Sequence, residues 1–305
     1  MPLLRAEADL LSQDDLTAGV IEEVITKDGL FGLLPFTKTE GKAYVYNRED
    51  PAKDGSAGVA FIDPNEAVTE SSARVVSITT HLRILAGDVD VDKFIMETMG
   101  DKNSQVAIQI AAKAKAVGRA FKSCVINGDN GVDGKTFDGI NQMCIDSANE
   151  VSAGANGNAL TYDMLDELLD AILLGADAIM MRSGTLRALK TLWRTAGGNT
   201  GGMIQIDNFG LSLPGHDGVP IIVNDWIPGD VAQGTEAATC SIYAMRLNEA
   251  DGLHGIYGGE SAGMRVEEVG TVQAKDAYRY RIKWYAGLAL KASHSLGAIR
   301  GITDV

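Results

Sequence analysis

The sequence predicts an α+β protein in which one domain is inserted into another. The first observation is a long amphipathic helix expected over residues 101–126. The second is a pair of closing strands within residues 265–290, where apolar and charged side chains alternate. Between helix and strands, residues 146–263 mix helical and strand patterns. This order indicates that the middle region interrupts a domain whose two parts are distant in sequence.

The composition is that of a soluble globular protein. The chain has 305 residues, 45% of them hydrophobic and 22% charged, and a net charge of -14. This length predicts about two domains, and the acidic balance disfavours a molecule that clamps nucleic acid with its whole surface. We expect no membrane span, because no apolar run approaches about 18 residues, and no secretory signal in the first thirty residues.

Three cysteines, an odd number without C-x-x-C spacing, indicate buried reduced thiols and not a metal or redox site. They are Cys124, Cys144 and Cys240. The four histidines are scattered, and none lies three or four residues from another histidine or a cysteine, so we expect no metal.

Residues 1–35 are expected to form an N-terminal arm. Ser12 or Asp14 could cap a short helix that Gly29 would close, and Pro35 would then turn the chain.

Residues 36–87 are expected to form an extended two-stranded ribbon. Its strands are predicted at 42–48 and 76–84, and a loop rich in Gly, Asp, Ala and Pro joins them over 49–65. An isolated two-stranded ribbon is marginally stable in water. The ribbon therefore lies on its own body or on a neighbouring subunit, and the residues alone slightly favour its own body.

The long helix has two chemically different sides. Val106, Val117 and Phe121 recur on an apolar side, whereas Lys115, Arg119 and Lys122 share a basic side. A turn cluster rich in Gly, Asn and Asp follows at 126–134. The basic side is explained by plain solvation, by acidic groups of another subunit, or by weak contact with nucleic-acid phosphates. The helix lacks interleaved aromatic residues, which disfavours sequence-specific binding.

The middle region is expected to alternate helices and strands. The predicted elements are helices at 162–174 and 183–194, strands at 178–181, 219–223 and 240–247, and a turn at 214–218.

One enzyme motif is present, the G-x-S-x-G sequence of residues 259–263 around Ser261. In hydrolases this pattern exposes a serine between a strand and a helix. Here the following segment alternates like a strand, and only Asp276 and His294 could complete a triad. Asp129 and its neighbours lack the spacing of a calcium loop, and no phosphate-binding loop occurs. We therefore expect no catalysis, no cofactor and no metal.

The order of these features resembles the HK97-fold major capsid proteins of tailed bacteriophages. An arm and an extended loop precede a spine helix, which ends in INGD at 126–129 and GI at 139–140. Residues 178–189 resemble the strand and following helix of the family's axial domain. Residues 213–225, LPGHDGVPIIVND, and the closing strand that ends at Lys291 before a short tail are also similar.

This resemblance implies an HK97-like capsid fold divided at specific boundaries. Residues 1–35 are the N-terminal arm and residues 36–87 the extended loop. Residues 88–145 and 264–305 form the discontinuous peripheral domain that contains the spine helix, and residues 146–263 form the inserted axial domain. The extended loop would then lie across an adjacent subunit, which reverses the preference drawn from the residues alone. The ribbon residues expected at this inter-subunit contact are Lys42, Tyr44, Tyr46, Arg48, Arg74, Val76, Ile78, Leu82 and Arg83.

The resemblance also implies a function. The chain would be a major capsid protein that self-assembles, as pentamers and hexamers, into an icosahedral shell around double-stranded DNA. Lys115, Arg119 and Lys122 would face the packaged DNA without reading its sequence. The protein would be assembled in the host cytoplasm and reside in the virion.

Separate scaffolding and portal proteins are expected partners, because the arm is too short to be a scaffolding segment; whether a decoration protein binds stays open. Lys42 and Lys53 lie in the ribbon, but no motif identifies an asparagine partner, so no crosslink is predicted. The alternatives are an encapsulin-type nanocompartment, whose shell encloses a cargo protein, and an esterase that uses Ser261.

Overall fold

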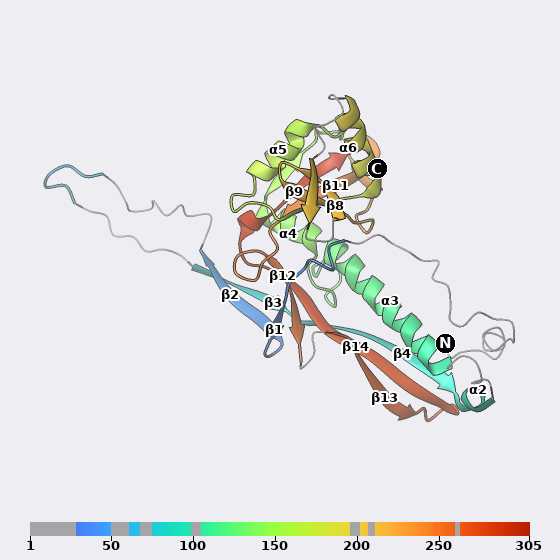
Figure 1. Ribbon diagram of the computed structural model, residues 1–305. Coiled ribbons are helices and arrows are strands. Elements are labelled where there is room, and N and C mark those ends of the chain that lie inside the picture. The colour runs from blue at the N-terminus through green and yellow to red at the C-terminus, as the bar shows by residue number, and fades with distance from the viewer. Residues whose placement is uncertain are drawn as a thin grey trace.

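The computed structural model describes residues 29–49, 61–67, 75–98, 105–195, 202–206, 211–259 and 263–305. These residues form a five-stranded sheet, an eight-stranded sheet and a two-stranded ribbon (Figure 1). The α+β fold class is therefore confirmed. The expected arm helix lies outside the described residues.

The five-stranded sheet is organised around its longest strand, β14 (Ala277–Leu290). Along one edge β14 pairs antiparallel with β4 (Arg83–Asp92). Along the other edge it pairs with β12 (Leu253–Gly258) and β13 (Arg265–Thr271), and β1 (Phe36–Thr39) adds parallel to β12. Segments from three distant parts of the chain thus meet in one sheet.

Helix α3 (Gln105–Asn127) lies along this sheet and contacts β4 and β14, as Figure 1 shows. The helix predicted at 101–126 is confirmed over the residues described, and the short helix α2 (Lys93–Thr98) precedes it. Phe121 on the buried side of α3 meets Trp284 of β14 with ring centroids 4.3 Å apart. Three further aromatic rings pack around this pair: Phe31, Phe36 and Phe137.

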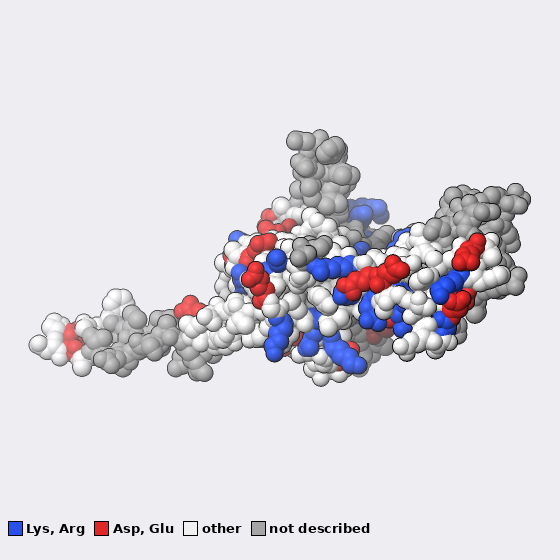
Figure 2. All heavy atoms as spheres, turned by 90° about the horizontal axis from the view of Figure 1, so that it is seen from below, with Lys and Arg blue, Asp and Glu red and all other residues white. Residues whose placement is uncertain are grey.

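The other face of the five-stranded sheet carries a ladder of ion pairs. Arg279 Nε lies 2.6 Å from Asp90 Oδ1, and Arg281 Nε lies 2.7 Å from Asp88 Oδ1, in directly opposed positions of β14 and β4. Lys283 continues the ladder to Glu267 of β13 at 2.6 Å. Figure 2 shows positive and negative side chains interleaved over this part of the body. This face is thus suited to solvent, because its charges are paired across strands.

The eight-stranded sheet has the order β5-β15-β11-β6-β9-β8-β7, and β10 pairs with β11. Helices α4 and α5 contact β15, and all four residues of β6 are buried. The bounds of these elements are α4 (Ile140–Ser147), β5 (Glu150–Ser152), α5 (Tyr162–Asp170), β6 (Ala178–Met181), α6 (Ser183–Thr195), β7 (Gly202–Ile206), β8 (Leu211–His216), β9 (Val219–Val223), β10 (Val231–Gln233), β11 (Glu236–Met245), the 3-10 helix η1 (Ser293–Ser295) and β15 (Leu296–Ile302).

Two predicted elements of this region are shorter than expected. The Thr161 hydroxyl accepts a hydrogen bond from the Met164 N–H and starts α5, but the helix ends at Asp170 and not at 174. The turn predicted at 214–218 is limited to Asp217 and Gly218, with φ of 46° and 81°, because β8 runs on to His216. A two-residue hairpin turn requires these positive angles.

Two strands belong to a sheet other than the one implied by the predicted domain boundaries. The tail expected after Lys291 is wrong, because residues 296–302 form β15, which pairs with β11 in the eight-stranded sheet. Conversely, β12 lies within the range 146–263 but pairs with β14. Strand pairing over long sequence separation decides both cases, and the local pattern does not record it.

The ribbon consists of β2 (Ala43–Glu49) and β3 (Val75–His81), paired antiparallel (Figure 1). It is shorter than the range 36–87, because both ends of that range belong elsewhere. Strand β1 pairs with β12, and β4 continues from the ribbon into the five-stranded sheet.

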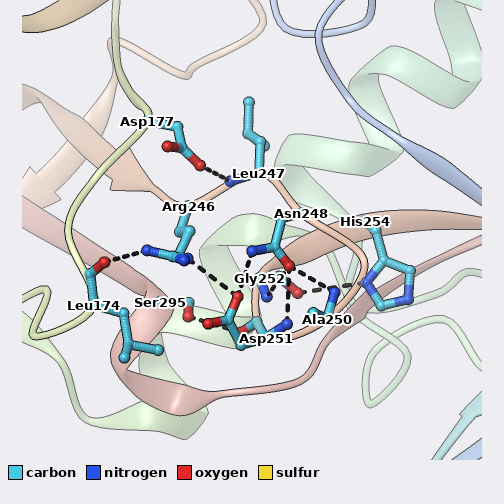
Figure 3. A network of polar contacts seen from close by, with 10 residues as sticks. All are labelled: Leu174, Asp177, Arg246, Leu247, Asn248, Ala250, Asp251, Gly252, His254 and Ser295. Carbon is cyan, nitrogen blue, oxygen red and sulfur yellow. Dashed lines mark hydrogen bonds and ion pairs between the residues drawn. The ribbon is translucent and has the colours of Figure 1, made fainter.

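A compact polar network joins the two large sheets, as Figure 3 shows. The chain passes from β11 to β12 through residues 246–252, where Asn248 Oδ1 accepts backbone N–H groups of Ala250, Asp251 and Gly252 at 2.6, 2.9 and 3.3 Å. The Ser295 hydroxyl donates to the Asp251 carbonyl at 2.8 Å. This crossing is therefore held by its own hydrogen bonds and by the neighbouring connection.

Candidate functional site

The ribbon is docked at its base on its own subunit. Tyr46 Oη donates to the Leu290 carbonyl at 2.6 Å. Arg48 donates to the carbonyls of Leu290 and Lys291, both at 2.7 Å. Burial raises the pKa of Tyr46 above its ordinary value, which keeps the hydroxyl a donor. Tyr44 lies beside Tyr46, with ring centroids 5.7 Å apart.

Tyr44, Tyr46 and Arg48 are thus engaged within the chain, and their expected role between subunits stays a prediction. The preference drawn from the residues alone, that the ribbon lies on its own body, describes this base.

The opposite face of the ribbon exposes apolar side chains. Val45 is 58% exposed and Val75 60%. Because side chains of a strand alternate between faces, Val45 points away from the docked face of the ribbon, which carries Tyr44 and Tyr46. Val76, which is 40% exposed, pairs directly with Arg48 and therefore lies on the docked face. Valines on an uncovered two-stranded sheet leave apolar area in water that a partner would bury.

Sequence reasoning selected the aromatic face of β2 and so missed Val45 and Val75. The signal was the period-two alternation itself, which separates Val45 from its tyrosine neighbours.

The described part of the ribbon loop, residues 61–67, lies far from the body in Figure 1. It folds into a turn, in which the Glu66 N–H donates to the Asp63 carbonyl at 3.0 Å and the Asp63 N–H to Glu66 Oε2 at 2.9 Å. Before this turn, Phe61 is fully exposed and Ile62 is 48% exposed. The loop therefore presents a second apolar feature, which sequence reasoning also missed.

The remaining ribbon residues differ in their surroundings. Lys42 is exposed, whereas Ile78, Leu82 and Arg83 are half-buried. Arg83 donates to Asn130 Oδ1 in the turn cluster after α3. Arg74 lies outside the described residues.

An open groove of about 240 Å³ lies where the ribbon base meets the turn cluster and α4. Its lining combines cationic, acidic and apolar side chains, among them Arg48, Arg83, Asp138, Asp146 and Met143. Asp129 does not extend this lining as a free carboxylate, because its Oδ1 accepts the N–H groups of Gly131 and Val132 at 2.7 and 3.2 Å. The turn cluster is thus closed by its own side chains, as the turn interpretation predicts.

The basic side of α3 is only partly open to solvent. Lys115 is exposed, and Arg119 and Lys122 are half-buried. The Lys122 ammonium lies 5.3 Å from the centroid of the Phe31 ring. None of the three is without a partner in the subunit. The helix thus presents positive charge that already contributes to internal contacts, and its expected contact with DNA stays a prediction.

Ser261 lies outside the described residues, and the segment after it is the strand β13, as the sequence predicts. Within the described part of the chain, no group of three His, Cys, Asp or Glu residues is placed to hold a metal ion. Nor does any described helix have the length and apolarity that a bilayer crossing demands.

Comparison with known proteins identifies the fold. No family model and no curated protein matches the chain. Among solved structures, it resembles the SrpI encapsulin of Synechococcus elongatus PCC 7942 with a TM-score of 0.71 and 21% identity, covering 99% of this chain and 96% of the other. It resembles the capsid of cyanophage A-1(L) with the same TM-score of 0.71 and 13% identity, covering 99% of this chain and 100% of the other. It also resembles the capsid of a native GTA particle, with a TM-score of 0.65 and 16% identity, covering 97% of each chain.

The chain therefore has the HK97 fold of phage capsids and an encapsulin, over nearly its whole length. The resemblance drawn from the order of motifs is confirmed at the level of the fold.

Proposed function

We propose that this chain assembles with copies of itself into a closed shell that encloses double-stranded DNA, as a phage major capsid protein. One observation carries the proposal. The ribbon exposes Val45 and Val75 on the face that its own subunit leaves uncovered. Covering such a strip with a second copy contributes about 25 cal/mol for each Å² of apolar area removed from water. The HK97 fold of the neighbouring structures, which are shell proteins, supports the same conclusion.

The proposed shell requires contacts that join different surfaces of neighbouring copies and close by rotation. Pentamers and hexamers would supply this closure, with scaffolding and portal proteins as separate partners. The shell would reside in the virion. The chain would carry out no catalysis, so neither the wild type nor a Ser261→Ala variant is expected to hydrolyse an ester.

Assembly is tested by negative-stain microscopy of the purified full chain. The wild type is expected to form uniform hollow particles. A Val45→Asp/Val75→Asp variant should fold with an unchanged circular dichroism spectrum but form no particles, because a carboxylate in each contact would be buried without a partner. A Val132→Asp variant, at a side chain that is 86% exposed in the turn cluster, is the matched control and should assemble. Particles of the ribbon variant that equal those of the wild type would contradict the proposal.

The DNA part of the proposal is tested with a Lys115→Gln/Arg119→Gln/Lys122→Gln variant. Each phosphate contact contributes about 0.9 to the slope of log affinity against log salt, so the variant should retain DNA with a flatter salt dependence while empty shells stay intact. The control replaces the exposed Arg187, Lys190 and Arg194 of α6 with Gln. An unchanged salt series for the α3 variant would refute the DNA-facing assignment.

A second candidate is an encapsulin-type compartment with a protein cargo. It is favoured by the encapsulin match, which has the same TM-score as the cyanophage capsid and the higher identity. Nucleic-acid content separates the two candidates. Particles from native host cells that contain a co-purifying protein and no protected DNA would select the compartment.

A further inference from the structure

A fully buried histidine lies beneath the base of the ribbon. His254 of β12 is 0% exposed, and its Nε2 has no hydrogen-bond partner. Its Nδ1 lies 3.4 Å from the Gly252 carbonyl oxygen, which can only accept, so the proton of the neutral ring belongs on Nδ1. Figure 3 shows this imidazole at the end of the polar network that joins the two sheets.

The ribbon packs directly on this ring. Tyr44 of β2 meets His254 edge to face, with ring centroids 5.6 Å apart and planes at 84°. The Lys291 ammonium lies 5.6 Å from the centroid of the Tyr44 ring. The two residues after Tyr44 on the same face, Tyr46 and Arg48, bind the carbonyls of Leu290 and Lys291. Any change that expels Tyr44 therefore acts on the whole docked base.

Charging this histidine inside the docked structure is unfavourable. Burial is the main cause that lowers the pKa of His254 below its ordinary 6.5, and the nearby Lys291 lowers it further. Glu249 of the 246–252 loop acts in the opposite direction, as does the hydrogen bond to Gly252. Asp251 of the same loop is already paired with Arg246 at 3.1 Å. A protonated ring would also bring a second N–H to a site where Nε2 has no acceptor.

We propose that His254 is a pH-sensitive latch for the ribbon: its neutral ring keeps Tyr44 docked, and its protonation releases the base of the ribbon from the body. The sign follows from the two states. At pH values well above 6.5 both states are neutral and docking is at full strength. As the pH falls below 6.5, the released state takes up a proton that the docked state resists, so docking weakens until the docked state is also protonated. This device belongs to a single subunit and does not depend on the proposed shell.

The size of the pH effect on ribbon docking is limited by the ordinary pKa of histidine. Between pH 7.5 and 5.5 the released population rises by at most about tenfold, the limit reached if the docked ring takes up no proton.

The test is hydrogen exchange of the full chain at pH 7.5 and 5.5, corrected for the intrinsic pH dependence of exchange. Amides of β2 and β3 in the wild type should lose several-fold protection at pH 5.5 relative to amides of α3. A His254→Phe variant, which keeps a ring for Tyr44 but cannot titrate, should show equal ribbon protection at both values. His254→Gln serves as a second non-titrating variant if the phenylalanine does not fit.

The matched control is His294→Gln, at an exposed histidine in η1. This variant should respond to pH as the wild type does. Ribbon protection that is equal at both pH values in the wild type would overturn the proposal, and so would a pH response that persists in both His254 variants.

Discussion

The eight-stranded sheet and the ribbon bury their side chains to opposite extents. Every residue of β6 is buried, and so is the continuous run Thr239–Met245 of β11. In β2 and β3, by contrast, no residue is fully buried, and the valines of one face are exposed. The sheet is therefore stabilised by burial inside the subunit. The ribbon depends on a few contacts at its base and on whatever covers its free face.

The largest loss of stability is expected from a side-chain truncation next to the eight-stranded sheet. Leu168 of α5 is fully buried against the eight-stranded sheet, and its side chain lies next to Gly297 of β15. We expect Leu168→Ala to lower the free energy of unfolding by about 3 kcal/mol, because it removes buried methyl groups and leaves a cavity. Urea denaturation followed by circular dichroism measures the loss. Leu173→Ala, at a side chain that is 73% exposed, is the control and should change little.

The ion pairs of the five-stranded sheet should have a smaller effect on stability than the Leu168 truncation. Their contribution should be lost in acid. Hydrogen bonds from Arg281 and Arg279 hold the pKa values of Asp88 and Asp90 below the ordinary 3.8. Their contribution to stability is thus present above about pH 4 and is lost as the pH falls through the lowered values. An Asp88→Asn/Asp90→Asn variant should melt at a lower temperature at pH 7 and show a smaller further decrease between pH 4.5 and 2.5. Parallel melting curves for variant and wild type across this range would contradict the assignment.

The ribbon should give the smallest change in stability. The Val45→Asp/Val75→Asp variant used to test assembly alters only exposed side chains of a subunit, so its free energy of unfolding should stay within about 0.5 kcal/mol of the wild type. Urea denaturation of the unassembled variant measures this. A loss similar to that of Leu168→Ala would mean that the free face packs inside the subunit, which would remove the contrast between the two regions.

Local patterns predicted the elements with strong periodicity. The long helix was predicted from its apolar recurrence, the buried strand 178–181 from its apolar run, and β14 from the alternation of Arg279, Arg281 and Lys283 with aromatic and aliphatic residues. In each case the burial that defines the element follows from neighbours in sequence.

Pairing over long sequence distances could not be predicted in this way. The sequence predicts a tail where strand β15 lies, because this short glycine-containing segment gains its place only by pairing with β11. For the ribbon, the sequence showed two faces but not which one its own subunit covers. That choice depends on the carbonyls of Leu290 and Lys291, more than 240 residues from Tyr46 and Arg48. The buried state of His254 is likewise a property of the assembled sheets.

The crossing between the two large sheets has a mechanical consequence. Asn248 ties three successive backbone amides, and Gly252 has no room for a side-chain carbon, since one would lie 2.5 Å from the Arg246 carbonyl oxygen. This connection is therefore rigid and resists changes of angle between the two halves of the subunit. If copies form a closed shell as proposed, the curvature of that shell is adjusted at the interfaces between copies. The radius of the shell would then be set by the contacts between neighbouring copies and not by bending within each copy.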